Sequence, residues 1–140
     1  MQLDHIGVVV ANLESGIRYY HEYFGYTWDG RIHADPLQRA RIALLLPANS
    51  DFAIELTEPT SADSPLMGPL KRGNRLLHLC YRVPNIQKAL TQFVALGSRI
   101  ISEPNPAEVL FTQDREAVEL IEAAAPTTDS HGTDDQDNER

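Results

Sequence analysis

Residues 3–26 read LDHIGVVVANLESGIRYYHEYFGY and residues 76–99 read LLHLCYRVPNIQKALTQFVALGSR, so the two halves of the chain open in a similar way. Both stretches begin with apolar residues that carry a histidine at the third position, His5 and His78, which lie 73 positions apart. A short apolar run bounded by turn residues is typical of a buried strand. The repeat therefore predicts two modules of the same kind, each beginning with a strand.

A helix is predicted to follow each of these strands. The strand residues lead to Asn12 in the first stretch and to Asn85 in the second, and asparagine is a favoured N-cap residue. Apolar residues then recur at helical spacing in both stretches. A glycine, Gly25 or Gly97, stands where the helical pattern ends, which is typical of a helix stop.

The two halves also end alike, with IELTE at residues 54–58 and VELIE at residues 118–122. Each half therefore consists of a strand, a helix and two or three further strands. The expected strands are residues 2–10, 39–47, 51–58, 76–83, 98–102, 108–112 and 116–122, with another in 27–35. We expect a single domain over residues 1–124, with module one at about 1–60, a connector rich in Pro, Gly and Ser at about 61–74, and module two at about 75–124.

Composition limits the possible functions. The chain has 140 residues, a net charge of −8 and no cluster of Lys and Arg, which argues against nucleic acid as a partner. No apolar stretch is long enough to span a membrane, and the N-terminus lacks the features of a signal peptide. Residues 125–140 are acidic without apolar periodicity, so we expect them to be disordered. Cys80 is the single cysteine, which is compatible with a reducing, cytoplasmic location.

Four polar residues lie in the middle of predicted strands among apolar neighbours: His5, Glu55, His78 and Glu119. A buried carboxylate needs a cation, a proton or a hydrogen-bond donor, because it is costly to bury alone. Two imidazoles and two carboxylates form a ligand set that suits Zn, Ni, Co, Fe or Mn. Each residue alone also fits a structural role in the core or on a solvent face. Because each half supplies one His and one Glu, the sequence predicts a single divalent metal site.

The same stretches resemble the vicinal oxygen chelate (glyoxalase/bleomycin resistance/dioxygenase) superfamily over residues 1–124, and within it proteins like methylmalonyl-CoA epimerase. The run ELTEP at residues 55–59, followed by DSPL at residues 63–66, is especially similar to an epimerase segment. The resemblance implies an α+β fold in which paired βαβββ modules form a cupped, open barrel-like mixed sheet around a metal site. It also implies that the ligand positions are those of His5, Glu55, His78 and Glu119.

The resemblance implies a divalent-metal-dependent enzyme that abstracts a proton next to a carbonyl and stabilises the enolate, with an epimerase-like isomerase as the first expectation. It implies a bound Co, Ni, Zn or Mn ion, a small-molecule carbonyl substrate, which is an acyl-CoA in an epimerase, and a homodimer. Glu119 and Glu55 are candidate bases. The further Glu of epimerases aligns with Ala34 here. His33 and Asp35 flank Ala34, and we expect their side chains to point elsewhere on the strand.

Two other functions remain open at this stage. The first is a glyoxalase I-type lactoylthiol lyase, because Glu55 matches the glyoxalase I choice of ligand. The second is a non-catalytic small-molecule binding or resistance protein, because the further Glu is missing and the loop before the last strand is short. Cys80 shares the face of His78 and is interpreted as a core residue rather than a nucleophile.

Overall fold

The computed structural model describes residues 1–105, 108–113 and 116–124, and the tail predicted at 125–140 lies outside the described residues. Each half of the described chain begins with a strand and a helix and continues with further strands, as the repeat predicts. They are β1 (Gln2–Val9), α1 (Leu13–Phe24), β2 (Thr27–Trp28), β3 (His33–Asp35), β4 (Ala40–Leu46), β5 (Ala53–Pro59), α2 (Met67–Lys71), β6 (Leu76–Val83), α3 (Ile86–Ala95), β7 (Arg99–Asn105), β8 (Glu108–Gln113) and β9 (Glu116–Glu122).

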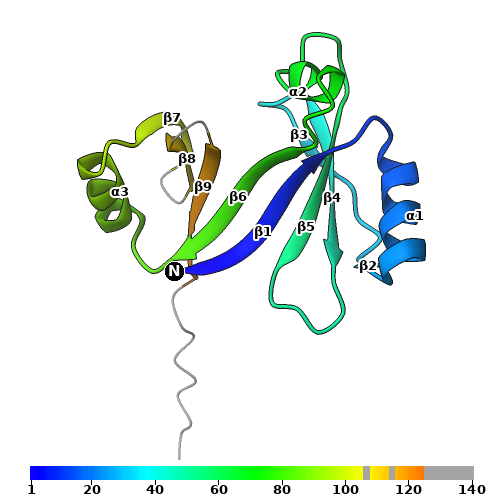
Figure 1. Ribbon diagram of the computed structural model, residues 1–140, viewed down its shortest axis with the longest axis horizontal. Helices are drawn as coiled ribbons and strands as arrows, with labels where there is room; N and C mark the ends of the chain where they lie inside the picture. The colour runs from blue at the N-terminus through cyan, green and yellow to red at the C-terminus, as the bar shows by residue number, and fades with distance from the viewer. Residues whose placement is uncertain (106–107, 114–115, 125–140) are drawn as a thin grey trace, which may run out of the picture.

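The strands form one mixed sheet in the order β2-β4-β5-β1-β6-β9-β8-β7, with β3 paired to β4. The first strands of the two halves, β1 and β6, run antiparallel at the centre of the sheet. Each has the last strand of its own half as its parallel neighbour, β5 beside β1 and β9 beside β6. The two modules therefore join edge to edge into a curved, unclosed sheet (Figure 1), and the predicted fold class is confirmed.

Both long helices begin as the sequence predicts. The side chain of Asn12 accepts a hydrogen bond from the backbone N–H of Ser15 at the start of α1. Asn85 does the same for Lys88 at the start of α3. Gly25 ends α1 with a φ of 69°, a left-handed conformation that favours glycine.

A second pair of contacts attaches each helix to the last strand of its module. Oε2 of Glu58, near the end of β5, accepts a hydrogen bond of 2.6 Å from the backbone N–H of Leu13. Oε2 of Glu122, at the end of β9, accepts one of 3.1 Å from Ile86. A carboxylate is stabilising at a helix N-terminus, where the backbone N–H groups have no partner within the helix. The second glutamate of each repeated run therefore supports a helix.

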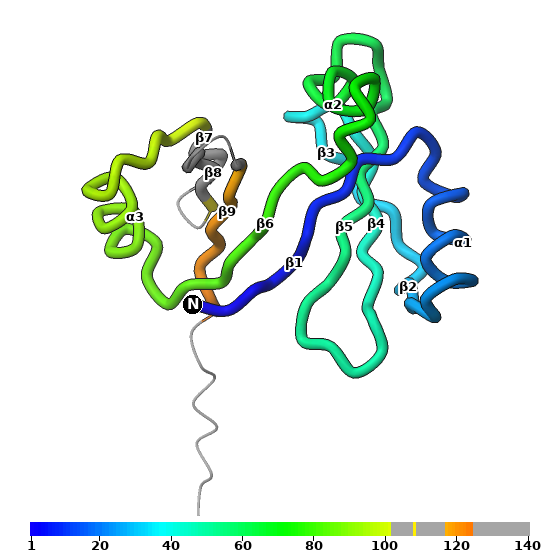
Figure 2. The backbone as a smooth tube through the Cα atoms, in the orientation of Figure 1, coloured from blue at the N-terminus to red at the C-terminus, as the bar shows by residue number. Residues whose placement is uncertain are grey.

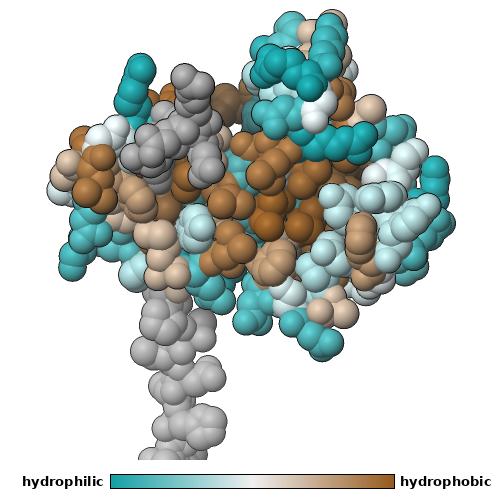
Figure 3. Space-filling view, in the orientation of Figure 1, coloured by the Kyte–Doolittle hydropathy of each residue, from teal (hydrophilic) through white to brown (hydrophobic). Residues whose placement is uncertain are grey.

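Both helices cover the sheet face that lies opposite Glu55 and Glu119. Residues of α1 pack with those of β4 and β5, and residues of α3 pack with those of β6 and β9. The first core contains Val10, Leu13, Ile17, Ala43, Leu45, Ile54 and Leu56, and the second contains Val83, Ile86, Ala89, Leu90 and Leu120. Side chains alternate faces along a strand, so Glu55 and Glu119 point away from these cores. Figure 3 shows that apolar side chains also gather across the middle of the molecule, over the central strands.

Two parts of the chain differ from the sequence-based expectation. The connector, expected to be irregular, contains the short helix α2, preceded by the buried Leu66, which packs against Val9 and Ala40. Figure 2 shows this connector leading from β5 to β6 at one end of the sheet. Residues 27–35, expected as a single strand, form the two short strands β2 and β3. None of the described helices is long and apolar enough to cross a membrane.

Candidate metal centre

Strand pairing places the four predicted ligands in two neighbouring rows across the sheet. In the first row, Gly7 of β1 is paired with Glu55 of β5 on one side and with His78 of β6 on the other. In the second row, Cys80 of β6 is paired with His5 of β1 and with Glu119 of β9. Residues paired directly across a sheet point to the same face. Each half therefore contributes one His and one Glu to a common surface.

The side chains of His5, His78 and Glu119 converge, and that of Glu55 lies beside them. Nε2 of His5 and Nε2 of His78 lie 3.1 Å apart. Oε2 of Glu119 lies 2.9 Å from Nε2 of His78 and 3.4 Å from Nε2 of His5. Oε2 of Glu55 lies 3.4 Å from Nε2 of His5, and its Oε1 lies 4.0 Å from Nε2 of His78. All four side chains are 9–16% exposed, so these charged groups meet in a site that is largely sheltered from water.

These distances fit a single divalent ion. Ligand atoms about 2.1 Å from one ion lie about 3.0 Å apart in octahedral geometry and about 3.4 Å apart in tetrahedral geometry. The separations of 2.9, 3.1 and 3.4 Å among His5, His78 and Glu119 span the same range. Mixed imidazole and carboxylate ligands are those that Zn, Ni, Co, Fe and Mn accept. The group whose ligand atoms all lie within 4.8 Å of one another consists of His5, His78 and Glu119, and Glu55 lies outside it.

The ionisation of the cluster shows its attraction for positive charge. Burial alone would lower the pKa of His5, but hydrogen bonds to Cys80 and Glu119 and the charge of Glu55 raise it to about 11. Burial would raise the pKa of Glu119, but its hydrogen bonds to His5 and His78 hold it well below its usual range. The pKa of Glu55 is raised, mainly by burial. Without a metal, the additional proton on His5 offsets part of the carboxylate charge, a role that a divalent ion can take over.

Gly7 makes room for His78. A Cβ atom added at Gly7 would lie 2.4 Å from Cε1 and 2.6 Å from Nδ1 of the imidazole, far inside ordinary contact distance. The corresponding residue of the second row, Cys80, is fully buried, and its pKa is raised mainly by burial. Sequence analysis did not assign Gly7 a role. The sequence feature that could have drawn attention to Gly7 is its spacing from Cys80, which is 73 positions, the same as that of the two histidines.

The strand β3 presents two of the candidate bases to the site face. Its register with β4 places His33 opposite Ile42. Because Ile42 is paired with Thr57 of β5, two positions beyond Glu55, His33 faces the same side of the sheet as Glu55. The charge of Asp35 contributes to the raised pKa of Glu55, after the effect of burial.

Ala34 faces the opposite side. It is paired with Arg41, whose guanidinium contacts Glu14 of α1, so this side of β3 is the side of the helices. His33 and Asp35 therefore point to the opposite face from Ala34, as expected, and that face is the one that carries Glu55. The carboxylate of Asp35 is already engaged, since it accepts hydrogen bonds from the backbone N–H groups of Leu37 and Gln38.

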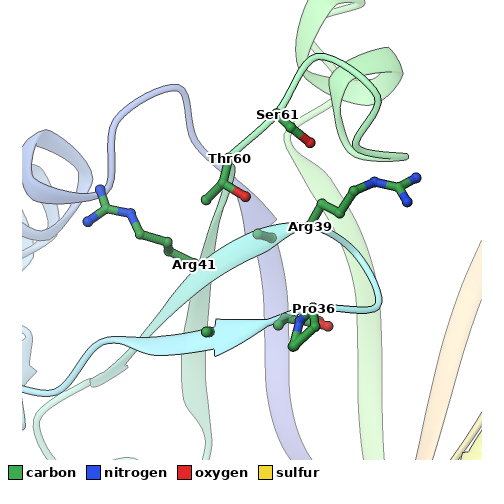
Figure 4. A pocket seen from close by; sticks show the side chains of 8 residues that line it. Pro36, Arg39, Arg41, Thr60 and Ser61 are labelled. Atoms are coloured by element: carbon green, nitrogen blue, oxygen red, sulfur yellow. The ribbon is translucent and has the colours of Figure 1, made fainter.

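A pocket of about 390 Å³ lies beside the β3–β4 hairpin. Its lining residues are Ala34, Asp35, Pro36, Arg39, Ala40, Arg41, Thr60 and Ser61. Figure 4 shows the two arginine side chains pointing away from each other. Arg41 pairs with Glu58 at 2.9 Å, and Arg39 approaches Asp63 at 3.5 Å. Because both cations already have acidic partners and do not converge, this pocket is a weaker candidate for chemistry than the metal centre.

Comparison with known proteins identifies the family of the chain. Residues 4–115 match the Glyoxalase/Bleomycin resistance protein/Dioxygenase superfamily. The chain belongs to this superfamily. Among curated relatives, the uncharacterized protein YqjC of Bacillus subtilis (strain 168) is 27% identical over 137 residues, which cover 93% of this chain and 96% of that protein. The mitochondrial methylmalonyl-CoA epimerase of Bos taurus is 28% identical over 104 residues, which cover 73% of this chain and 58% of that protein.

Solved structures of methylmalonyl-CoA epimerases have the same fold. The crystal structure of methylmalonyl-CoA epimerase from Mycobacterium tuberculosis matches with a TM-score of 0.77 and 24% identity, covering 89% of each chain. A methylmalonyl-CoA epimerase in complex with methylmalonyl-CoA and NH4+ matches with a TM-score of 0.74 and 20% identity, covering 89% of this chain and 95% of that chain. Structural neighbours of this chain therefore include an epimerase bound to an acyl-CoA.

Proposed function

We propose that the chain is a divalent-metal-dependent enzyme that moves a proton on the carbon next to a carbonyl, most simply as an isomerase of the methylmalonyl-CoA epimerase type. The observation on which the proposal rests is the convergence of His5, His78 and Glu119, with Nε2 of His5 3.1 Å from Nε2 of His78 and the Glu55 carboxylate 3.4 Å from His5. The superfamily match and the epimerase relatives support an enzyme of this kind.

The ion would be held by His5, Glu55, His78 and Glu119. When bound, it supplies positive charge next to the carbonyl oxygen, where negative charge develops as the proton leaves carbon. The proposed ion is one of the divalent metals that imidazole and carboxylate ligands suit, and Co, Ni, Zn and Mn are the ones to be tested.

The carboxylates of the site are proposed to move the proton. Oε2 of Glu119 contacts both imidazoles, at 2.9 and 3.4 Å, whereas Glu55 approaches them at 3.4 and 4.0 Å. Glu55 is therefore less tightly held and is the first candidate base, with Glu119 as the second. His33 is an exposed third candidate on the same face, and Asp35 is the weakest because its carboxylate already accepts hydrogen bonds.

The proposed substrate is an acyl-CoA that carries an acidic hydrogen next to its thioester carbonyl. The bovine relative is a methylmalonyl-CoA epimerase, and a structural neighbour is in complex with methylmalonyl-CoA. A homodimer and a cytoplasmic location are further parts of the proposal. Light scattering coupled to size-exclusion chromatography tests the dimer, which a monomer mass would contradict.

Metal content per chain is the first test. Native protein and His78→Ala are analysed by mass spectrometry of the metal after loading with Co, Ni, Zn or Mn. We expect near one ion per chain in the native protein and far less in the variant. Asp51→Asn is the matched control, because Asp51 is exposed in the loop before β5. Native protein that takes up no metal under any loading would refute the metal site.

Exchange of the substrate hydrogen is the second test. Metal-loaded protein is incubated with methylmalonyl-CoA in heavy water, and deuterium at the α carbon is followed by mass spectrometry. We expect exchange in the native protein, and its loss in Glu55→Gln if Glu55 is the base. Metal-loaded protein that exchanges no hydrogen would refute the epimerase proposal while leaving the metal site intact.

A lactoylthiol lyase of the glyoxalase I type is the second candidate, favoured by the carboxylate of Glu55 within the site. Formation of a lactoylthiol from methylglyoxal and a panel of thiols would support it. Binding of small molecules without exchange or lyase turnover would instead favour a binding protein.

A further inference from the structure

The strand β1 departs from regular pairing immediately before His5. Leu3 is paired with Tyr81 of β6 and His5 with Cys80, so Asp4 is an extra residue on β1. Such a β-bulge breaks the alternation of side chains along a strand and re-aims them. Here it allows two consecutive side chains, those of Asp4 and His5, to contact each other.

Both oxygens of the Asp4 carboxylate have partners. Oδ2 accepts a hydrogen bond of 2.8 Å from Nδ1 of His5. Oδ1 accepts one from Nη2 of Arg82, which lies on the same face of β6 as Cys80. The side chains of Asp4 and His5 are only 19% and 9% exposed, whereas that of Arg82 is 40% exposed. The three side chains therefore form a chain of contacts that leads from the protein surface to the candidate metal centre.

When a metal ion takes the place of the Nε2 proton, this arrangement keeps the remaining proton of His5 on Nδ1. An imidazole that donates Nδ1–H to a carboxylate then presents the lone pair of Nε2 to the metal, and carboxylates of this kind orient metal-binding histidines in many proteins. We propose that Asp4, held in place by Arg82, is a positioning residue that aims Nε2 of His5 into the metal site without being a ligand itself. The inference rests on the metal site proposed above.

The second half of the chain shows that this contact is not a by-product of the repeat. Gly7 is paired with His78 and Val8 with Leu76, so Leu77 is the extra residue of an equivalent bulge on β6. Leu77 stands 73 positions after Asp4 but has no acceptor, and it packs with the apolar cluster around Leu66. The bulge is thus repeated while the carboxylate is not. His78 is confined instead by its close fit over Gly7.

A competing arrangement uses some of the same atoms. Donor atoms of Asp4, His5 and Cys80 lie within 4.8 Å of one another, which would suit a metal bound by a carboxylate, Nδ1 and a thiolate. The contact of Arg82 with Asp4 disfavours this arrangement, because a guanidinium next to the carboxylate repels a second cation. The two arrangements differ in whether sulfur binds the metal, which makes them distinguishable by spectroscopy.

The test measures Co²⁺ affinity by calorimetry after treatment with a chelator. The proteins compared are the native chain, Asp4→Asn, Asp4→Ala, Arg82→Met and the double variant that combines Asp4→Ala with Arg82→Met. We expect Asp4→Ala to weaken Co²⁺ binding about 10–100-fold, the range found for lost outer-shell partners. The effect of Asp4→Asn is expected to be smaller, because its amide oxygen still accepts a hydrogen bond. Arg82→Met is expected to weaken binding in the native background and to add little to Asp4→Ala, since both act through one chain of contacts.

Thermal unfolding of the metal-free proteins separates positioning from folding, because a purely structural role lowers metal-free stability and leaves Co²⁺ affinity unchanged. Asp51→Ala is the matched control. If Asp4→Ala does not fold, the Co²⁺ affinity of Arg82→Met is the deciding measurement.

The results that would contradict the proposal can be told apart, because each overturns a different part of it. Native protein that binds no Co²⁺ would overturn the proposed metal site. Normal affinity in folded Asp4→Ala, or in Arg82→Met where Asp4→Ala does not fold, would overturn the positioning role alone. A thiolate-to-cobalt absorption band that disappears in Cys80→Ala would show sulfur ligation and overturn the role of Asp4 proposed here.

Discussion

Gly7→Ala is the substitution that tests the geometry of the candidate site most directly. Gly7 does not have a left-handed backbone, so alanine is strained there only by what its Cβ meets. That atom would lie 2.4 Å from Cε1 of His78, and ordinary contact begins at 3.4 Å. The imidazole would therefore have to move by about 1 Å (3.4 − 2.4 Å).

A displacement of this size is large for a metal ligand. Metal–ligand distances are conserved to about 0.2 Å, so a ring moved by several times that amount can no longer share an ion with His5. We expect metal affinity to fall at least as much as on loss of an outer-shell partner, which is about 10–100-fold. Overpacking also costs about 1–3 kcal/mol of the free energy of unfolding.

The assay is calorimetric titration of chelator-treated protein with Co²⁺ or Zn²⁺, together with urea unfolding of the metal-free proteins. Gly16→Ala is the matched control, because a Cβ there would lie 3.2 Å from Cδ1 of Leu56, on the opposite face of the sheet. We expect the control to retain native affinity. Native affinity in Gly7→Ala would refute the reasoning, because His78 would then not need the space above residue 7 to bind the metal.

Three further predictions concern the helices and the metal. Glu58→Ala removes the acceptor for the Leu13 N–H and should lower the free energy of unfolding by about 1–3 kcal/mol in urea, with metal affinity unchanged by calorimetry. Asn85→Ala removes the cap of α3 and should cost about 1 kcal/mol in the same unfolding experiment, whereas an unchanged midpoint would argue against the cap. Metal at 100 times its dissociation constant should stabilise native protein by about 2.7 kcal/mol in thermal unfolding, and His5→Ala should abolish the shift.

The repeat made much of the fold predictable. The starts of α1 and α3 were placed correctly because Asn12 and Asn85 are local signals, readable without knowledge of the tertiary structure. The helix α2 was not predicted, because residues typical of loops precede it and its position depends on the packing of Leu66 against Val9. The sequence did not indicate which face of β3 lies on the side of Glu55, because in a three-residue strand the register with β4 decides this.

The sequence named the residues of the candidate site, but it did not identify the residues that hold their side chains in place. His5, Glu55, His78 and Glu119 could be named because each half repeats one His and one Glu. Their convergence depends on β1 and β6 being direct neighbours in one particular register, which spacing alone does not determine.

The proposed ligands are repeated in the two halves of the chain, whereas the residues that orient them are not. The register of the sheet brings one His and one Glu from each half to the same face, so the proposed ligands occur at equivalent positions in the two halves. The supports differ between halves: Asp4 stands where the second half has Leu77, and Gly7 stands where it has Cys80. One imidazole is therefore aimed by a charged hydrogen bond and the other by steric fit. Loss of Asp4 should then disturb only His5, and a side chain at residue 7 should disturb only His78, although both changes weaken the same site.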